Sequence, residues 1–447
     1  MKNILFTLVL WLFTFNASAQ QSWQVVGEAG FPNEEVSQLT MKLDNNGVPY
    51  VAYVKFDGIG LKISVMKFEN EVWQYVGNEG FSEYIGGLSY LSLAIDSNNI
   101  PYVAYRNLDG SSKITVMKFE NNNWQVVGDA EFSLGATAYI SLALDNNDVP
   151  YVSFRDGANA GKATVMKFEN NNWQTVGEAG FSAGEIIQTS LIFDANNILY
   201  IAFSDGTNAG KATVMKFENN NWQTLGEAGF SIGSIYRSSL AVNSNNILYM
   251  TYSDNGNFSE ISVLKFENNN WEYVGSIGIS QGSSYSPSLR FDNNDIPYVA
   301  YGKVENYEIS VVKFENNNWQ NVGSLNYNGW ESVSLGISDN GMLFLALKEI
   351  SSPYGATVLK YDSTMSINTH THSNILFYPN PANDFVNIDN ISDNATIKVF
   401  DIMGKLIYST RANRQITINT AELSNGIYLV QIITDNQQKT IKKLIIQ

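Results

Sequence analysis

A tryptophan recurs at a nearly constant spacing along most of the chain, and this period constrains the fold more than any other feature. The recurring positions are Trp23, Trp73, Trp124, Trp173, Trp222, Trp271 and Trp319. The sequence around them repeats as well, so that residues 140–177 and 189–226 are closely similar. A period of about 50 residues is typical of solenoids, propellers and repeat arrays.

Each repeat predicts four short strands separated by turns rich in Asn, Asp and Gly. In the third repeat the expected strands are Ser141–Leu144, residues 151–154, Ala163–Phe168 and Trp173–Gly177. Asn and Asp favour such turns because they tolerate left-handed dihedral angles and hydrogen-bond their own backbone. Four antiparallel strands per repeat correspond to one blade of a β-propeller.

The number of strands predicts a closed ring. The first and third strands of the repeat each occur seven times, but the first tryptophan strand precedes every other strand, and none follows the last repeat. We therefore expect an all-β, seven-bladed β-propeller over residues 20–362, in which Trp23–Gly27 supplies the outer strand of the last blade. An open array is the weaker alternative, because it leaves unpaired edges at both ends.

The repeated aromatic residues have two interpretations, a row of carbohydrate platforms or a packing element. A residue at the same strand position in every blade is most simply part of the core. We therefore expect packing roles for the tryptophans and for the phenylalanines of the Gly-Phe-Ser steps. The latter are Phe81, Phe132, Phe181 and Phe230. The repeats resemble generic exported bacterial propeller repeats, without the signatures of WD, kelch or Asp-box blades.

The N-terminus has the features of a secretory signal peptide. A short positive start precedes the apolar run Ile4–Phe15, and small residues follow up to Ala19. We expect residues 1–19 to be removed, because the run is short of the ~20 residues of a spanning helix. We also expect no membrane-spanning segment in the mature chain.

Composition excludes several kinds of chemistry. The chain has no cysteine, so disulfides and thiolate sites are excluded. Its two histidines, His370 and His372, lie in a polar stretch, residues 363–374, that we interpret as a linker. A catalytic triad in the propeller is therefore not expected. A formal net charge of −16 argues against a nucleic-acid partner.

The rim that carries the longer, more variable loops is the candidate ligand face, since binding residues concentrate on loops held by a rigid scaffold. Candidates at the start of the first strands are Tyr90, Tyr139, Gln188, Arg237 and Tyr285, and those at the end of the second strands are Arg106, Arg155, Asp156, Asp205, Asp254 and Lys303. Such a mixture of aromatic and charged groups suits a sugar or a peptide. A solvated rim with local salt bridges is an equal alternative.

The sequence singles out no catalytic residue and no cofactor. Asp-rich turns at Asp44, Asp96, Asp145 and Asp292 offer oxygen atoms to calcium, but turn chemistry explains them better. A glycosidase needs two opposed carboxyl groups, and no pair departs from the repeat pattern. Enzymatic activity is thus the minority interpretation.

Beyond the linker the repeat ends, and residues 375–447 alternate as six strands of a small antiparallel β-sandwich. This segment contains Tyr378-Pro379-Asn380-Pro381, then Asp401, Gly404 and Lys405, and finally Gly426 and Tyr428. With these motifs it resembles the type A C-terminal sorting domain of the type IX secretion system of Bacteroidetes. The resemblance implies the type IX secretion machinery as a partner, and a secreted or outer-surface location in a Gram-negative bacterium.

Together these features predict an exported propeller that binds glycan or protein, as an adhesin or lectin does. The alternatives are a polysaccharide-active lyase or hydrolase that uses rim carboxylates or tyrosines, and a passive component of a surface layer.

Overall fold

The computed structural model describes residues 22–85, 90–107, 111–323, 325, 327, 329–349, 355–362, 375–401, 405–434 and 439–447. The predicted signal peptide and the predicted linker with its two histidines lie outside these residues, as does Gly404. The chain divides into two compact units, one ending at residue 363 and the other starting at residue 364. Each unit is described by itself.

The first unit contains seven four-stranded antiparallel sheets, each with its strands in meander order. Each sheet is one blade, and its strands are given from the innermost outward. Blades 1 to 3 consist of β2 (Val36–Leu43), β3 (Pro49–Phe56), β4 (Leu61–Glu69) and β5 (Val72–Tyr75); of β6 (Ser92–Ile95), β7 (Pro101–Arg106), β8 (Ile114–Glu120) and β9 (Asn123–Val126); and of β10 (Thr137–Leu144), β11 (Pro150–Asp156), β12 (Lys162–Glu169) and β13 (Asn172–Thr175). Blades 4 to 7 consist of β14 (Ile186–Phe193), β15 (Leu199–Asp205), β16 (Lys211–Glu218) and β17 (Asn221–Thr224); of β18 (Ile235–Val242), β19 (Leu248–Asp254), β20 (Glu260–Glu267) and β21 (Asn270–Tyr273); of β22 (Ser284–Phe291), β23 (Pro297–Lys303), β24 (Ile309–Glu315) and β25 (Asn318–Asn321); and of β26 (Gly329–Ile337), β27 (Met342–Glu349), β28 (Ala356–Asp362) and β1 (Gln24–Val25).

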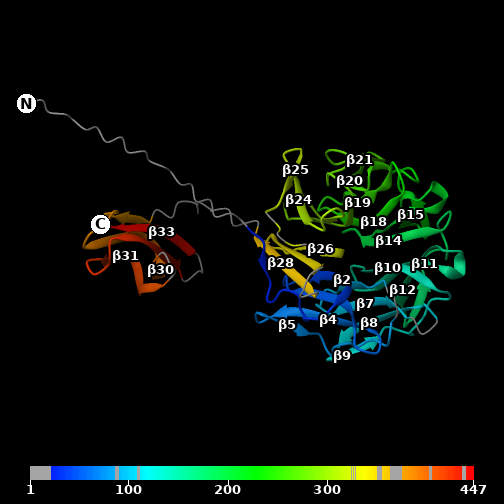
Figure 1. Ribbon diagram of the computed structural model, residues 1–447, viewed down its shortest axis with the longest axis horizontal. Coiled ribbons are helices and arrows are strands. Elements are labelled where there is room, and N and C mark those ends of the chain that lie inside the picture. Colours follow the sequence, from blue (N-terminus) through cyan, green and yellow to red (C-terminus); the bar gives the residue numbers. More distant parts are fainter. Residues whose placement is uncertain are drawn as a thin grey trace, which may run out of the picture. The chain divides into compact units, whose positions relative to one another are not determined.

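The blades follow one another in chain order around the central axis of a ring (Figure 1). Each innermost strand contacts the innermost strand of the next blade, and β26 of blade 7 contacts β2 of blade 1, so the ring is closed. Apolar clusters fill the spaces between neighbouring blades rather than one central core. The predicted seven-bladed β-propeller is confirmed.

The N-terminal strand closes the ring as predicted. β1 pairs antiparallel with β28, with Gln24 opposite Lys360 and Val25 opposite Leu359, and Val26 N–H donates to Val358 O at 2.8 Å. The beginning and the end of the propeller therefore share one sheet, which covers the edge that β28 would otherwise expose.

Every repeated tryptophan joins its blade to the preceding one. The seven indole N–H groups each donate to a backbone carbonyl there, at 2.7–2.9 Å. The acceptors are the carbonyls of Val322, Val26, Val76, Val127, Val176, Leu225 and Val274, in the order of the tryptophans. Because Trp23 donates to blade 6 and Trp73 to blade 7, this ring of hydrogen bonds has no gap.

Phenylalanine side chains from the preceding connections cover five of these indoles. Phe132, for example, stacks on Trp173 with ring centroids 4.0 Å apart and an interplanar angle of 7°. The same stack occurs at Phe31, Phe81, Phe181 and Phe230. These contacts assign the repeated aromatic residues to packing between blades rather than to an exposed platform.

The turns between the first and second strands form a second set of contacts between blades. Oδ1 of Asp145 accepts from the backbone of Asn147 and Val149, so the carboxylate closes its own turn. Asn146 N–H then donates to Oδ1 of Asn197 in the next blade at 2.9 Å. The turns at Asp44, Asp96 and Asp292 close in the same way, which agrees with turn chemistry at these aspartates.

Three short 3₁₀ turns follow the second strands of blades 3, 4 and 5: η1 (Gly157–Asn159), η2 (Gly206–Asn208) and η3 (Asn255–Asn257). Asp156, Asp205 and Asp254 cap them, and all three carboxylates are buried. At Asp205, Thr207 N–H donates to Oδ1 at 3.0 Å, and Asn208 Nδ2 donates to Oδ2 at 2.9 Å.

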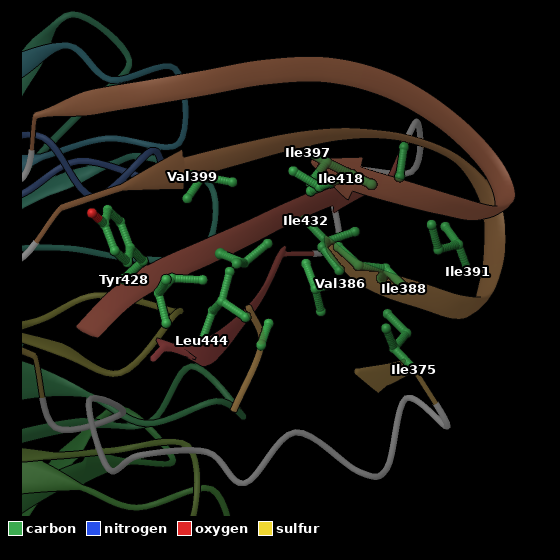
Figure 2. Packing of buried hydrophobic residues seen from close by; sticks show 14 residues of the cluster. Ile375, Val386, Ile388, Ile391, Ile397, Val399, Ile418, Tyr428, Ile432 and Leu444 are labelled. Atoms are coloured by element: carbon green, nitrogen blue, oxygen red, sulfur yellow. The ribbon is translucent and has the colours of Figure 1, made fainter. Parts of the chain in front are cut away.

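The second unit is one five-stranded sheet: β29 (Leu376–Tyr378), β30 (Phe385–Phe400), β31 (Leu406–Asn419), β32 (Gly426–Thr434) and β33 (Lys439–Ile446). The predicted antiparallel pairing holds, but four of the expected short strands are two long ones. β30 and β31 pair along their whole length and absorb the expected breaks as register shifts. Their inward side chains pack with Tyr428, Ile432 and Leu444 on one core (Figure 2).

Removal of residues 20–27 should destabilise the propeller strongly. It exposes the edge of β28, removes the Trp23 hydrogen bond and takes the Val26 acceptor away from Trp73. Loss of a large buried aromatic residue costs about 3–5 kcal/mol, so the Tm should fall by roughly 10 °C or more. Calorimetry checks this, with the exposed Gln24→Ala as the control. An unchanged Tm would contradict closure by β1.

Asp205→Asn should lower the free energy of unfolding by about 1–3 kcal/mol, because an amide cannot accept all the hydrogen bonds that reach the carboxylate. Burial raises the pKa of this carboxyl, but hydrogen bonds from Thr207 and two further side chains outweigh it and hold the pKa below its ordinary value of 3.8. The stabilisation is thus present above that value and lost as the pH falls through the folded-state pKa. Urea titrations between pH 2 and 7 measure it.

The matched control is Glu185→Gln, which changes an exposed carboxylate on the same side of the blade. This variant should stay within about 0.5 kcal/mol of the wild type. Equal stability of both variants would mean that Asp205 is no structural cap.

Candidate functional site

The innermost strands bend at the same place in six blades. The residue at the bend has a left-handed backbone, with φ between 48° and 59°, and in five blades it coincides with a register shift. These residues are Gln38, Tyr90, Tyr139, Gln188, Arg237 and Ser286. A bulge of this kind changes the direction of one side chain without breaking the sheet.

The six side chains meet at one end of the central channel. With Ser332 of blade 7 they line a cavity of about 480 Å³, which is within the size range of small-molecule sites. Thr40 and Ser334 lie further along the same wall. We call the seven residues Gln38, Tyr90, Tyr139, Gln188, Arg237, Ser286 and Ser332 the mouth residues.

Two tyrosines and an arginine form one side of the mouth. The rings of Tyr90 and Tyr139 lie 4.8 Å apart at 56°. The Arg106 guanidinium stacks over Tyr90 at 5.3 Å and donates to Thr137 O at 3.2 Å. Burial and the neighbouring Tyr139 raise the pKa of Tyr90 to about 12, so this phenol is neutral at physiological pH. Its chemistry is therefore stacking and hydrogen bonding.

Arg237 forms the other side of the channel mouth. Its Nη1 donates to Ser286 Oγ at 2.9 Å, and its guanidinium lies 5.8 Å from the Tyr236 ring. Arg237 and Tyr236 also line a side cavity of about 320 Å³ between blades 5 and 6. Tyr285 lines this side cavity, because Ser286 occupies the mouth position in blade 6.

The remaining predicted rim residues lie elsewhere. Arg155 pairs with Glu185, and Lys303 pairs with Glu308 at 3.5 Å, so both belong to local ion pairs. Asp156, Asp205 and Asp254 are the buried caps described above. The structure thus brings together Tyr90, Tyr139, Gln188 and Arg237 in the channel mouth, with Arg106 beside Tyr90.

Sequence reasoning missed three mouth residues, Gln38, Ser286 and Ser332. Alignment of all seven repeats on the buried residue three positions later, such as Met41 or Leu289, places Gln38 and Ser286 beside Tyr90. The same alignment places Ser332 of blade 7, three positions before the buried Leu335.

The residues that the structure describes include no cluster of three or more His, Cys, Asp or Glu side chains suited to a metal ion. Within the same residues, none of the helical segments has the length and apolar character needed to span a bilayer.

In the second unit the motif residues hold the chain end in place. Asn380 Nδ2 donates to Lys443 O, and its Oδ1 accepts from Ile445 N–H, both at 2.9 Å. Asp401 closes a turn by accepting from Lys405 N–H at 2.9 Å. Tyr428 is buried and donates to Ser424 O at 3.0 Å.

Comparison with solved structures gives the following similarities. The chain superimposes on a fungal alcohol oxidase of the AA5 family, in complex with copper, with a TM-score of 0.55, 8% identity and coverage of 96% of this chain and 99% of that one. A polysaccharide lyase of family PL25, an ulvan lyase, gives a TM-score of 0.51, 10% identity and coverage of 76% and 94%. PorZ, a surface component of the type IX secretion system of Porphyromonas gingivalis, gives 0.47, 13% identity and coverage of 93% and 59%. At these identities the similarity concerns the fold alone.

Comparison with curated protein sequences gives no match. The family model described as "secretion system C-terminal sorting domain" matches residues 376–447, nearly all of the second unit. These are the residues whose motifs resemble the type IX sorting domain. The second unit is therefore a type IX C-terminal sorting domain, which marks this chain as a secreted or outer-surface protein of a Gram-negative bacterium.

Proposed function

We propose that the exported propeller binds a glycan at the mouth of its central channel. The observation that carries this proposal is the cavity of about 480 Å³ lined by the mouth residues. They combine two tyrosine rings, two amides, two hydroxyls and a guanidinium on rigid strands. Aromatic faces pack against the apolar faces of sugar rings, and amide and guanidinium groups hydrogen-bond sugar hydroxyls.

The scaffold supports such a site energetically. Five of the six bend residues are flanked on both sides by paired strand residues, and Tyr90 lies two residues before the start of β6. Arg106 and Arg237 stack on or bond to neighbouring mouth or rim side chains. Preorganised side chains lose little conformational entropy on binding. The side cavity between blades 5 and 6 adjoins the mouth at Arg237, which extends the surface available to an oligosaccharide.

A polysaccharide-active enzyme is the second candidate, since an ulvan lyase shares the fold. Such an enzyme would use tyrosines or carboxylates. The raised pKa of Tyr90, about 12, leaves almost no phenolate at neutral pH to act as a general base, and the described cavity lining carries no carboxylate. These features favour binding without turnover, as in an adhesin or lectin.

A glycan array probed with the mature chain tests the proposal, with product analysis of every glycan that binds. Retention without cleavage supports a lectin-like role, and new reducing ends or unsaturated sugars support the enzyme. If the chain binds none of the glycans or matrix proteins, this result would favour a passive component of a surface layer.

Tyr139→Ala should weaken binding of the best glycan about tenfold or more, a loss of about 1.4 kcal/mol or more, because it removes one of two paired aromatic faces. Arg237→Gln should act similarly, and isothermal titration measures both. Val72→Ala, an exposed apolar residue next to the β4–β5 turn, is the control and should bind normally. Unchanged affinity in both mouth variants would refute the mouth as the site.

A further inference from the structure

The wall of the channel is built in tiers, each with one residue from every innermost strand. The first tier is the set of mouth residues. Two positions further on lies a hydroxyl tier, which consists of Thr40, Ser92, Ser141, Ser190, Ser239, Ser288 and Ser334. Two positions deeper lies a third, deep tier, which consists of Lys42, Ala94, Ala143, Ile192, Ala241, Arg290 and Gly336. All seven members of the deep tier pair with an aromatic residue of the adjacent strand, which places them at one level.

The three tiers carry basic residues and no acidic ones, although the chain as a whole is acidic. The chain as a whole has 43 acidic and 27 basic residues. The tiers nevertheless include three cations, Arg237, Lys42 and Arg290, and no acidic residue, and the structure describes every one of their positions. A positive channel in an acidic protein attracts anions from solution and concentrates them at its wall.

The two cations of the deep tier are close to each other. Lys42 lies on blade 1 and Arg290 on blade 6, on either side of Gly336 of blade 7, which has no side chain. Burial lowers the pKa of Lys42 to about 7, and the nearby Arg290 guanidinium contributes to this shift. As whole residues Lys42 and Arg290 have intermediate solvent exposure, while burial of their charged ends lowers the pKa of both groups.

Arg290 holds its guanidinium at the channel wall. Its Nη1 donates to Leu289 O at 2.6 Å, and Leu289 N–H bonds Ser239 Oγ of the preceding blade. Backbone groups of Leu289 therefore point away from β23 and toward the channel side of β22. Lys42 follows Thr40 on the same face of β2, and Thr40 lines the cavity.

The Lys42 ammonium has no hydrogen bond or ion pair with any residue that the structure describes. Two other ionisable groups lie near it, Tyr50 opposite on β3 and Asp44 after the end of β2. Asp44 Oδ1 already accepts from Asn46 and Val48 in its own turn. Among the side chains of β3, β6, β22 and β26 that the structure describes, none is acidic, so none of these balances the charge of Lys42.

We propose that Lys42 and Arg290 bind an anionic group of the ligand, a carboxylate or a sulfate ester, at the floor of the channel. This inference rests on the proposed glycan site and narrows it to acidic glycans. The mouth residues contact the sugar rings, the hydroxyl tier lines the passage, and the deep tier lies ~13 Å below the mouth by strand rise. Two like charges without a partner repel each other, and a bound anion satisfies both.

Inorganic sulfate tests the anion site without any glycan. Sodium sulfate should raise the Tm of the mature chain more than sodium chloride at equal ionic strength. Lys42→Met, Arg290→Met and the double variant should lose this extra stabilisation. Lys67→Met is the control, because Lys67 is paired with Glu69 on the outer part of blade 1. An extra sulfate effect that is absent in the wild type, or equal in all variants, overturns the proposal.

A comparison of sugars tests whether the anionic group of the ligand is a carboxylate or a sulfate ester. Glucuronate, a sulfated hexose and the matching neutral sugar are compared by isothermal titration. The wild type should bind at least one acidic sugar about tenfold more tightly than the neutral one, and the double variant should bind all three alike. Equal binding of all three by the wild type would overturn the acidic preference but leave the glycan site intact.

The pH dependence of stability provides an independent readout in low-salt chloride. Between pH 7 and the ordinary lysine pKa of 10.5, the unfolded chain keeps the Lys42 proton and the folded chain releases it. The folded state is therefore stabilised as the pH rises through this window. The Tm of the wild type, relative to that of Lys42→Met, should rise between pH 7 and 10. A constant difference would show that no unbalanced ammonium lies in the channel.

Discussion

The hydrogen bond from each tryptophan indole to the carbonyl of the preceding blade is the constraint on which the propeller depends. The donor and its acceptor are largely removed from water, and an unpaired buried group would cost about 1–3 kcal/mol. Each blade therefore needs a neighbour on the side of its indole. Such a requirement, repeated seven times, is met without an exception only when the blades close into a ring.

Much of the fold follows from the sequence because the repeat and the number of strands are explicit. The displaced first tryptophan predicted closure by β1, and the pairing of Gln24 with Lys360 confirms it. The full length of the innermost strands could not be predicted from the sequence. The strand expected at Ser141–Leu144 begins at Thr137, because left-handed Tyr139 interrupts the alternation that a sequence pattern detects. The segment between Asp389 and Ala395 is turn-like in composition, yet β30 continues through it by shifting its register.

The candidate site could be predicted in part. Tyr90, Tyr139, Gln188 and Arg237 were expected at the channel mouth and line its cavity. The sequence did not show that Asp156, Asp205 and Asp254 are buried caps, because an Asp before a tight turn has the same sequence pattern whether it faces solvent or caps the turn. Only the hydroxyls of Thr164 and Thr213, which donate to Asp156 and Asp205 from the adjacent strand, distinguish the two cases. Lys42 and Arg290 are far apart in the sequence, and their proximity depends on the closed ring.

Closure by β1 also has a consequence for the order of folding. Blade 7 cannot form until the segment around Gln24 meets β28, more than 300 residues later in the chain. Contacts of such high sequence separation form slowly, because the loop that they close must first be ordered. The sorting domain begins shortly after β28. The last blade to be completed is therefore the one that directly precedes the sorting domain in the sequence.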